Sequence, residues 1–360
     1  MENLRHTSIP TPAVAAPFLF SGGQQQGPVS NHRPIHGSFV NHAAAPNNSR
    51  QNDAMDESED NPPTYDSDGH RPSRLVLLRY GHQVFPGGVI PRMVEVPAHL
   101  DIQYINVSGD YSLHTEYASK PRKFNSPLLD GLDFLKASHR KEVPELWASL
   151  EWAQEFAVLV SRLVARNPAP SQIEIHPPFC STTPTIDTFL ESYEVFEQAI
   201  LAAYPDCQIV LENRTGTKHS SKFLMSGSDS ILAMGQALQQ TRLKLGIALD
   251  VPQMFTASFG TKHLVGLEGL PLIERLMPIH DRIHTLHLWG RSTGGGAHGG
   301  GLDGLFDGNT DGKRASLQAL RNVINDGDPR HLVIEVRRAA DVAAIIQDLE
   351  QVGMVLESAQ

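Results

Sequence analysis

Four apolar segments in the second half of the chain each end in a side chain that can bind a metal ion. These segments are residues 208–212, 245–250, 283–287 and 331–335. Their last residues are Glu212, Asp250, His287 and Glu335. Short apolar runs of this kind are typical of buried parallel strands, whose carboxyl ends meet at one edge of the sheet. The pattern therefore predicts a cation site with mixed oxygen and nitrogen ligands, although each residue alone could simply be a solvated strand end.

The same strand and helix alternation extends over most of the chain. Further strands are predicted at 74–80, 101–107 and 172–176, with an eighth before residue 100. Apolar residues at helical spacing predict helices over 144–164, 186–203, 229–240, 267–277, 315–324 and 339–349. Repeated strand–helix units favour a closed (β/α)₈ TIM barrel over residues 73–360. An open doubly wound sheet remains the alternative, since it also binds ligands at the carboxyl ends of its strands.

Residues 1–72 differ in composition from the rest of the chain. They are rich in Pro, Gly, Asn, Ser, Gln and His, with an acidic patch at 53–60. Such a segment buries too little apolar surface to offset its ordering entropy, so we expect a disordered low-complexity tail. Within it, Pro62-Pro-Thr-Tyr65 fits the proline–tyrosine pattern bound by WW domains, which makes a WW-domain contact a candidate interaction.

Charge and cysteine content restrict the classes of function. The formal net charge is −10 and the pI is about 5.9, so nucleic acid is not the expected partner. Cys180 and Cys207 lack the spacing of a disulfide framework or a thiolate zinc site. No apolar run has the length of a membrane span, and the first residues do not resemble a secretory signal. We therefore expect an intracellular, cytoplasmic protein that acts on a small molecule.

Several polar residues beside the strand ends are candidates for catalysis or substrate binding. His176 ends the segment 172–176 and is a further ligand, a general base or a histidine that orients a neighbour. Asn213 and Arg214 follow Glu212 directly, and Arg291 follows the segment that ends at His287. The guanidinium groups of Arg214 and Arg291 suit anionic or hydroxylated substrates. Together with the amide of Asn213, they are predicted to hold substrate oxygens.

The segment 290–312 has an unusually high density of glycine around His298. One interpretation is a mobile lid that covers the substrate and brings His298 or Asp303 to the rim. The other interpretation is a flexible insertion without a catalytic role. The sequence does not separate them.

The strand-end residues resemble those of the xylose-isomerase-like TIM-barrel superfamily, over roughly residues 172–360. In its epimerase branch, four strand ends supply Glu, Asp, His and Glu to one divalent ion. The resemblance therefore implies Mn²⁺, Mg²⁺ or Co²⁺, with Zn²⁺ as a further candidate, on Glu212, Asp250, His287 and Glu335. It also implies that Glu212 and Glu335 are the acid/base pair, which suits a metal-stabilised enediolate.

The superfamily also contains class II apurinic endonucleases, which use a three-metal cluster. Counterparts of its ligands stand at His176, Glu212, Asp250 and His287, and Asn213 also has a counterpart. The cluster needs a His where this chain has Gln253, and an Asp-x-His pair where only Ala297-His298 stands. These differences disfavour cleavage of DNA. A His often contacts substrate at the place of Gln253 in epimerases, so Gln253 is the corresponding candidate here.

Three functional hypotheses follow. The first is a divalent-metal-dependent isomerase or epimerase acting on a small polyhydroxylated or phosphorylated compound, with Glu212, Glu335 and His176 as catalytic residues. The alternative is a metal-assisted phosphoester hydrolase. The third is an inactive barrel that serves as a binding or scaffold protein. Metal content separates the third hypothesis from the others, and solvent deuterium exchange separates the first two.

Overall fold

The computed structural model describes residues 73–99, 105–116, 126–139, 141, 144–183, 185–215, 223–260, 265–292, 297–306 and 308–357. The predicted tail and the Pro62–Tyr65 motif lie outside these residues, so both stay predictions. Within the described part of the chain, no helix combines the length and the apolar character needed to cross a membrane.

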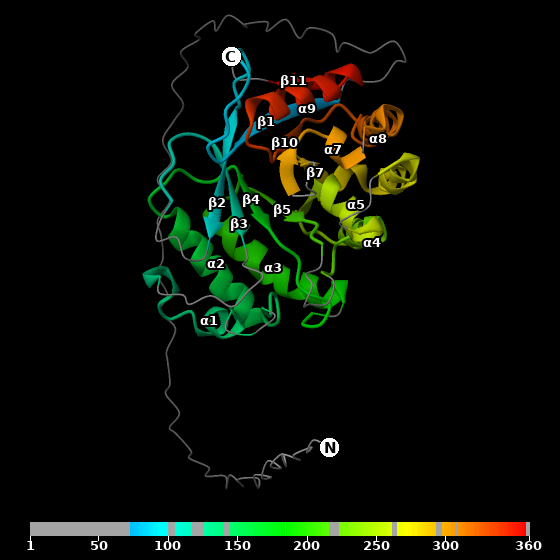
Figure 1. The fold of residues 1–360 in the computed structure, drawn as a ribbon. Coiled ribbons are helices and arrows are strands. Elements are labelled where there is room, and N and C mark those ends of the chain that lie inside the picture. Colours follow the sequence, from blue (N-terminus) through cyan, green and yellow to red (C-terminus); the bar gives the residue numbers. More distant parts are fainter. Residues whose placement is uncertain are drawn as a thin grey trace, which may run out of the picture. The chain divides into compact units, whose positions relative to one another are not determined.

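Eight parallel strands close into a barrel (Figure 1). They are β1 (Arg74–Tyr80), β2 (Met93–His99), β3 (Tyr111–Glu116), β4 (Gln172–Ile175), β5 (Gln208–Glu212), β6 (Gly246–Asp250), β7 (Ile283–Leu288) and β10 (Arg330–Ile334). Each strand pairs with the next, and β10 pairs back onto β1 with Leu75 opposite Arg330. This closure confirms the predicted (β/α)₈ barrel and excludes the open sheet.

One strand prediction was wrong. Residues 105–107 belong to no strand, and the strand of this unit is β3, several residues later. The expected eighth strand before residue 100 is confirmed as β2. The sequence of β2 is Met-Val-Glu-Val-Pro-Ala-His, and that of β3 is Tyr-Ser-Leu-His-Thr-Glu. Polar residues are mixed with apolar ones in both strands, so neither contains an apolar run that would identify it.

Helices follow most strands and lie outside the barrel (Figure 1). They are α1 (Asp133–His139), α2 (Leu150–Val164), α3 (Ile186–Ala203), α4 (Ser228–Gln239), α5 (Val251–Phe259), α6 (Leu270–Glu274), α8 (Thr310–Val323) and α9 (Ala339–Gln351). The helix predicted over 267–277 is instead α6 flanked by 3₁₀ turns at Leu267–Gly269 and Met277–Arg282. A further 3₁₀ turn spans Pro127–Leu129.

The helix predicted from residue 144 begins later, at Leu150. Ser149 caps its first turn, because its side chain accepts a hydrogen bond from the Trp152 N–H at 3.2 Å. Trp147, just before the cap, has a φ of 57° and is fully buried against Phe156 and Phe196. Its apolar character belongs to this aromatic contact rather than to a helical face, which explains the early predicted start.

The main hydrophobic core lies between the outer surface of the barrel and the helices. On β4, Ile173 and Ile175 face this core, so Gln172 and Glu174 face the barrel interior. A small apolar cluster of Leu78, Met93 and Val333, on which Tyr80 packs, is separate from this core. Polar side chains therefore occupy much of the barrel interior, which is unusual for a packed core.

Two additions modify the barrel. Strand β11 (Val355–Glu357) pairs with the first residues of β1, where β2 does not pair. Strands β8 (Gly290–Arg291) and β9 (Ala297–Gly300) form an antiparallel pair after β7, followed by the short helix α7 (Asp303–Phe306). Part of the predicted lid is thus regular structure; whether it moves stays untested.

Candidate metal centre

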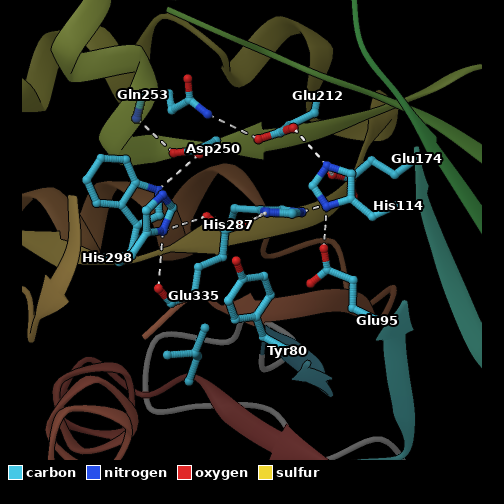
Figure 2. Close-up of polar contacts among 12 residues, drawn as sticks. Tyr80, Glu95, His114, Glu174, Glu212, Asp250, Gln253, His287, His298 and Glu335 are labelled. Atoms are coloured by element: carbon cyan, nitrogen blue, oxygen red, sulfur yellow. Dashed lines mark hydrogen bonds and ion pairs between the residues drawn. The ribbon is translucent and has the colours of Figure 1, made fainter. Parts of the chain in front are cut away.

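Histidines and carboxylates from the barrel strands converge at its carboxyl end (Figure 2). The buried members are Glu95, His114, Glu174, His176, Glu212, Asp250, His287 and Glu335. They come from strands β2 to β7 and β10 or from the residues just after them. Strand alternation explains the grouping, because every second residue of a barrel strand faces the interior.

Glu212 lies against two histidines. Its Oε2 is 2.7 Å from His176 Nε2 and 3.4 Å from His114 Nε2. The two histidine Nε2 atoms are 3.0 Å apart. The other ring nitrogen of His114, Nδ1, contacts the Glu95 carboxylate (Figure 2). Three ligand-competent atoms, from His114, His176 and Glu212, therefore face one another inside the barrel.

Arg214 and Gln253 approach Glu212 as well. Arg214 Nη1 lies 3.2 Å from Glu212 Oε2 and 3.4 Å from Oε1, and its side chain is 31% exposed. Gln253 Nε2 donates to Glu212 Oε1 at 3.3 Å, while its Oε1 accepts from the Thr215 N–H at 2.9 Å. Arg214 thus presents a partly accessible cation beside the buried cluster.

His287 bridges two further glutamates. Its Nε2 lies 3.0 Å from Glu174 Oε2, and its Nδ1 lies 3.3 Å from Glu335 Oε1. Glu335 Oε2 is in turn 3.2 Å from Nδ1 of His298 on β9. The His298 ring packs against Trp289 with ring centroids 4.5 Å apart. The β8–β9 pair therefore brings His298 to the predicted rim.

Asp250 is held by donors of the protein itself. Its Oδ1 accepts from the Gln253 N–H at 2.8 Å and caps α5, and its Oδ2 accepts from Trp289 Nε1 at 3.0 Å. Asn213 binds the Asp250 backbone on both sides, at 2.8 Å and 3.0 Å. Burial, followed by the charges of Glu335 and Glu212, raises the pKa of Asp250 to about 8.

The histidines differ in protonation because their surroundings differ. Burial lowers the pKa of His114 and His287, but Glu174 and the other carboxylates outweigh burial and raise both pKa values well above the usual range. Burial and the charge of Arg214 lower the pKa of His176 to about 4. Without a metal, protons on His114 and His287 thus offset part of the carboxylate charge.

The residues fit a divalent cation. Among the described residues, three sets of possible ligands lie within 4.8 Å of one another: His114–His176–Glu212, Glu174–Glu212–His287 and Glu95–His114–Glu335. Glu95 Oε2, Glu174 Oε1 and His287 Nδ1 are buried and form no hydrogen bond, although Glu174 Oε1 and His287 Nδ1 each have an ion-pair contact at 3.3 Å. Such atoms are costly to bury unless a cation or another partner satisfies them. Imidazole and carboxylate ligands suit Zn²⁺ and Mn²⁺.

The structure distributes the predicted quartet over these sets. Glu212 and His287 share one set, and Glu335 belongs to another. Asp250 belongs to none of the three sets found in the described residues, and the charges of Glu335 and Glu212 contribute to its raised pKa. Metal binding by all four residues stays a prediction.

Arg291 and Asp303, two further predicted residues, have contacts with residues outside the cluster. Arg291 is buried and donates from Nη2 to Thr256 Oγ1 at 2.9 Å. Asp303 accepts from Lys313 Nζ at 2.7 Å and is largely exposed. The substrate-binding roles predicted for Asn213, Arg214, Gln253, Arg291 and His298 remain untested.

Sequence reasoning missed Glu95, His114 and Glu174. A usable signal existed for Glu174, because it stands two residues before His176 on the same strand and so faces the same side. Glu95 and His114 lie on the two strands without a clear apolar pattern. Their proximity follows only from β2–β3 pairing, which a sequence pattern does not specify.

Comparison with known proteins finds only distant structural similarity. No family model and no curated protein match the chain. A xylose isomerase domain protein from Planctomyces limnophilus is 13% identical, with a TM-score of 0.35, and the match covers 76% of this chain and 98% of that one. A xylose isomerase domain protein from Alicyclobacillus acidocaldarius subsp. acidocaldarius is 12% identical, with a TM-score of 0.39 and coverages of 78% and 98%.

A third solved structure, AsfvAP:AG, is 14% identical, with a TM-score of 0.42 and coverages of 68% and 85%. The strand pairing and the polar interior define a (β/α)₈ barrel with a candidate metal centre at its carboxyl end. The (β/α)₈ barrel that the sequence predicted is confirmed by this strand pairing.

Proposed function

We propose that this barrel is a divalent-metal-dependent hydrolase of phosphoesters. The observation that carries the proposal is the place of Glu212, which belongs both to the set with His114 and His176 and to the set with His287. A carboxylate shared by two ligand sets can hold two cations side by side. Paired cations suit the displacement of one phosphoester oxygen by another.

Divalent ions held here would supply Lewis acidity and lower the pKa of water, which phosphoester hydrolysis requires. The chain supplies an anion-binding group in Arg214. Its guanidinium is fixed by Glu212, yet its side chain is 31% exposed, so it can reach a phosphoryl oxygen at the rim. The acidic net charge of −10 favours a small phosphoester over a nucleic acid.

His298 is the candidate for proton transfer to the leaving group. Its Nδ1 is held 3.2 Å from Glu335 Oε2, and its side chain is 41% exposed. A histidine oriented through one ring nitrogen can deliver a proton from the other, Nε2. This role differs from that of the buried histidines, which have no comparable access to solvent.

Isomerisation through an enediolate stays a second prediction. This reaction requires Glu212 and Glu335 to transfer protons to and from the substrate. The charges of both glutamates also contribute to the raised pKa of Asp250. Glu212 is contacted by His176, His114, Arg214 and Gln253, which leaves its carboxylate little freedom to act as a base. For this reason hydrolysis is favoured over isomerisation.

The test is metal analysis combined with an activity assay. We expect purified protein to bind Zn²⁺ or Mn²⁺ and to hydrolyse p-nitrophenyl phosphate or its diester only with the metal present. Glu212→Gln should lower kcat/KM by a factor on the order of 100 or more and reduce the bound metal. Glu194→Gln, an exposed change on α3, is the control and should match the wild type.

Two results would contradict the proposal. One is a protein that binds no divalent ion and gains no thermal stability from added Zn²⁺ or Mn²⁺, which would favour a binding or scaffold role. The other is metal-dependent incorporation of solvent deuterium into a sugar without phosphoester cleavage, which would favour the isomerase.

A further inference from the structure

We propose that Glu174 is a metal ligand of this site, holding a cation together with Glu212 and His287. The inference deepens the proposed function and rests on its cation site. Glu174 was not among the residues predicted from the strand ends, because it stands two residues before the end of the segment 172–176. The structure brings it into a ligand set that the sequence pattern did not contain.

The position of Glu174 is fixed by its strand. It is fully buried on β4, opposite His114 of β3 in the strand register. Thr115 Oγ1 donates to the Glu174 backbone oxygen at 2.7 Å, which holds this part of the strand. Because Ile173 and Ile175 pack outward, the Glu174 side chain has no alternative to the barrel interior.

The two carboxylate oxygens of Glu174 have different surroundings. Oε2 lies 3.0 Å from His287 Nε2. Oε1 is buried and has no hydrogen-bond partner, although His114 Nε2 is 3.3 Å away. The charge on His114 offsets only part of the charge on this oxygen, because the same ring also contacts Glu95 and Glu212. The unsatisfied Oε1 is therefore an observation separate from the mere presence of acidic residues.

Asp250 provides the contrast. Both of its carboxylate oxygens already accept hydrogen bonds from the protein, from the Gln253 N–H and from Trp289 Nε1. Glu174 keeps an oxygen available, and its ligand atom lies within 4.8 Å of those of Glu212 and His287. The distances between ligand atoms therefore favour Glu174 over Asp250, which belongs to none of the sets found in the described residues.

The experiment measures Zn²⁺ binding to the full chain by competition with a chromogenic chelator, together with the number of bound ions and the rise in Tm on adding Zn²⁺. Glu174→Gln is the informative variant, because its amide oxygen still accepts from His287 while the charge of the ligand is lost. Glu197→Gln is the control, since Glu197 is a buried glutamate of α3 that belongs to none of the ligand sets and accepts a hydrogen bond from Tyr193 Oη.

We expect the wild type to bind two ions, Glu174→Gln to bind one with a smaller rise in Tm, and Glu197→Gln to bind two. Glu174→Asp, which keeps the charge but moves the oxygens, should raise the Kd of the second ion at least about tenfold. This variant gives a second test if Glu174→Gln fails to fold.

Other outcomes overturn a specific part. Two ions bound by Glu174→Gln at unchanged Kd would overturn the role of Glu174 and leave the proposed function intact. The loss of the same ion in both Gln variants would also overturn it, because buried charge in general would then explain the loss. A wild type with one ion, absent from Glu174→Gln, would support Glu174 and overturn the two-cation hydrolase. A wild type without ions would overturn both.

Discussion

His331 joins a polar network inside the barrel that is separate from the candidate metal centre. Its Nδ1 donates to Gln172 Oε1 at 2.7 Å, and Thr285 Oγ1 donates to the same oxygen at 2.9 Å. Gln172 Nε2 donates onward to Ser112 Oγ at 3.1 Å. Burial, followed by the charge of His284, lowers the pKa of His331 to about 4.

This lowered pKa predicts a loss of stability in acid. In the unfolded chain the His331 pKa is about 6.5, so the unfolded state binds a proton that the folded state excludes. Stability from neutral His331 is present above pH 6.5, falls as the pH drops toward 4, and changes little below that. The full difference is on the order of 3 kcal/mol.

His331→Gln should remove this contribution, because a glutamine amide can donate to Gln172 without titrating. Urea unfolding between pH 7 and pH 4 should show the variant gaining on the wild type as the pH falls. All other titrating groups are common to both proteins and cancel in the difference. Parallel stability curves would show that His331 is not buried as a neutral ring.

At the scale of elements, the β8–β9 pair depends on two glycines that allow close backbone contact. A Cβ added at Gly304 would lie 1.9 Å from the Arg291 carbonyl oxygen, and one at Gly290 would lie 1.7 Å from that of Gly301. The β8–β9 pair that these contacts allow holds His298 beside Glu335. Lys313 supports it by joining Asp303 of α7 to Asp348 of α9.

We expect Gly304→Ala to displace this pair and to lower the free energy of unfolding by about 1–3 kcal/mol, the usual range for overpacking. Amide hydrogen exchange over residues 297–300 should become faster. Gly301→Ala is the control, since its Cβ would meet only Ala344 Cβ, at 3.7 Å. Equal exchange in the two variants would refute the idea that close packing holds the pair.

At the scale of the whole molecule, β11 returns the end of the described chain to the first barrel strand. Val355 N–H donates to the Ser73 carbonyl oxygen at 2.9 Å, and Glu357 forms ion pairs with Arg74 and Arg92. The strand occupies the side of β1 that β2 leaves unpaired. The β1–β11 pairing thus joins Arg74 and Val355, which are about 280 positions apart in the sequence.

Val355→Pro should destabilise the barrel, because proline removes the N–H and leaves the buried Ser73 carbonyl without its donor. The expected loss is on the order of 1–3 kcal/mol. Val355→Thr keeps the N–H at a position that is 47% exposed and should cost little. Thermal unfolding of both variants is the measurement. A Val355→Pro protein as stable as Val355→Thr would show that the pairing of β11 with β1 does not stabilise the barrel.

The sequence by itself determined the barrel class and named five of the eight buried residues of the candidate site. Strands β5, β6, β7 and β10 are local apolar runs, and each polar strand end is visible from its own few residues. Glu212, Asp250, His287 and Glu335 could be placed near the carboxyl rim on that basis alone. Local periodicity carries this information because it depends on the next few residues and not on distant partners.

Only the tertiary structure decided which of these side chains meet. Glu95, His114 and Glu174 face the interior, where an ordinary barrel strand would carry apolar residues. Because polar residues stand at these positions in β2 and β3, neither strand shows the apolar run by which a buried strand is recognised in a sequence. Burial of these groups depends on partners from other strands, such as His114 for Glu95 and His287 for Glu174. Whether these buried polar groups have partners cannot be read from neighbouring residues in the sequence, because strands far apart in the sequence must first close the barrel.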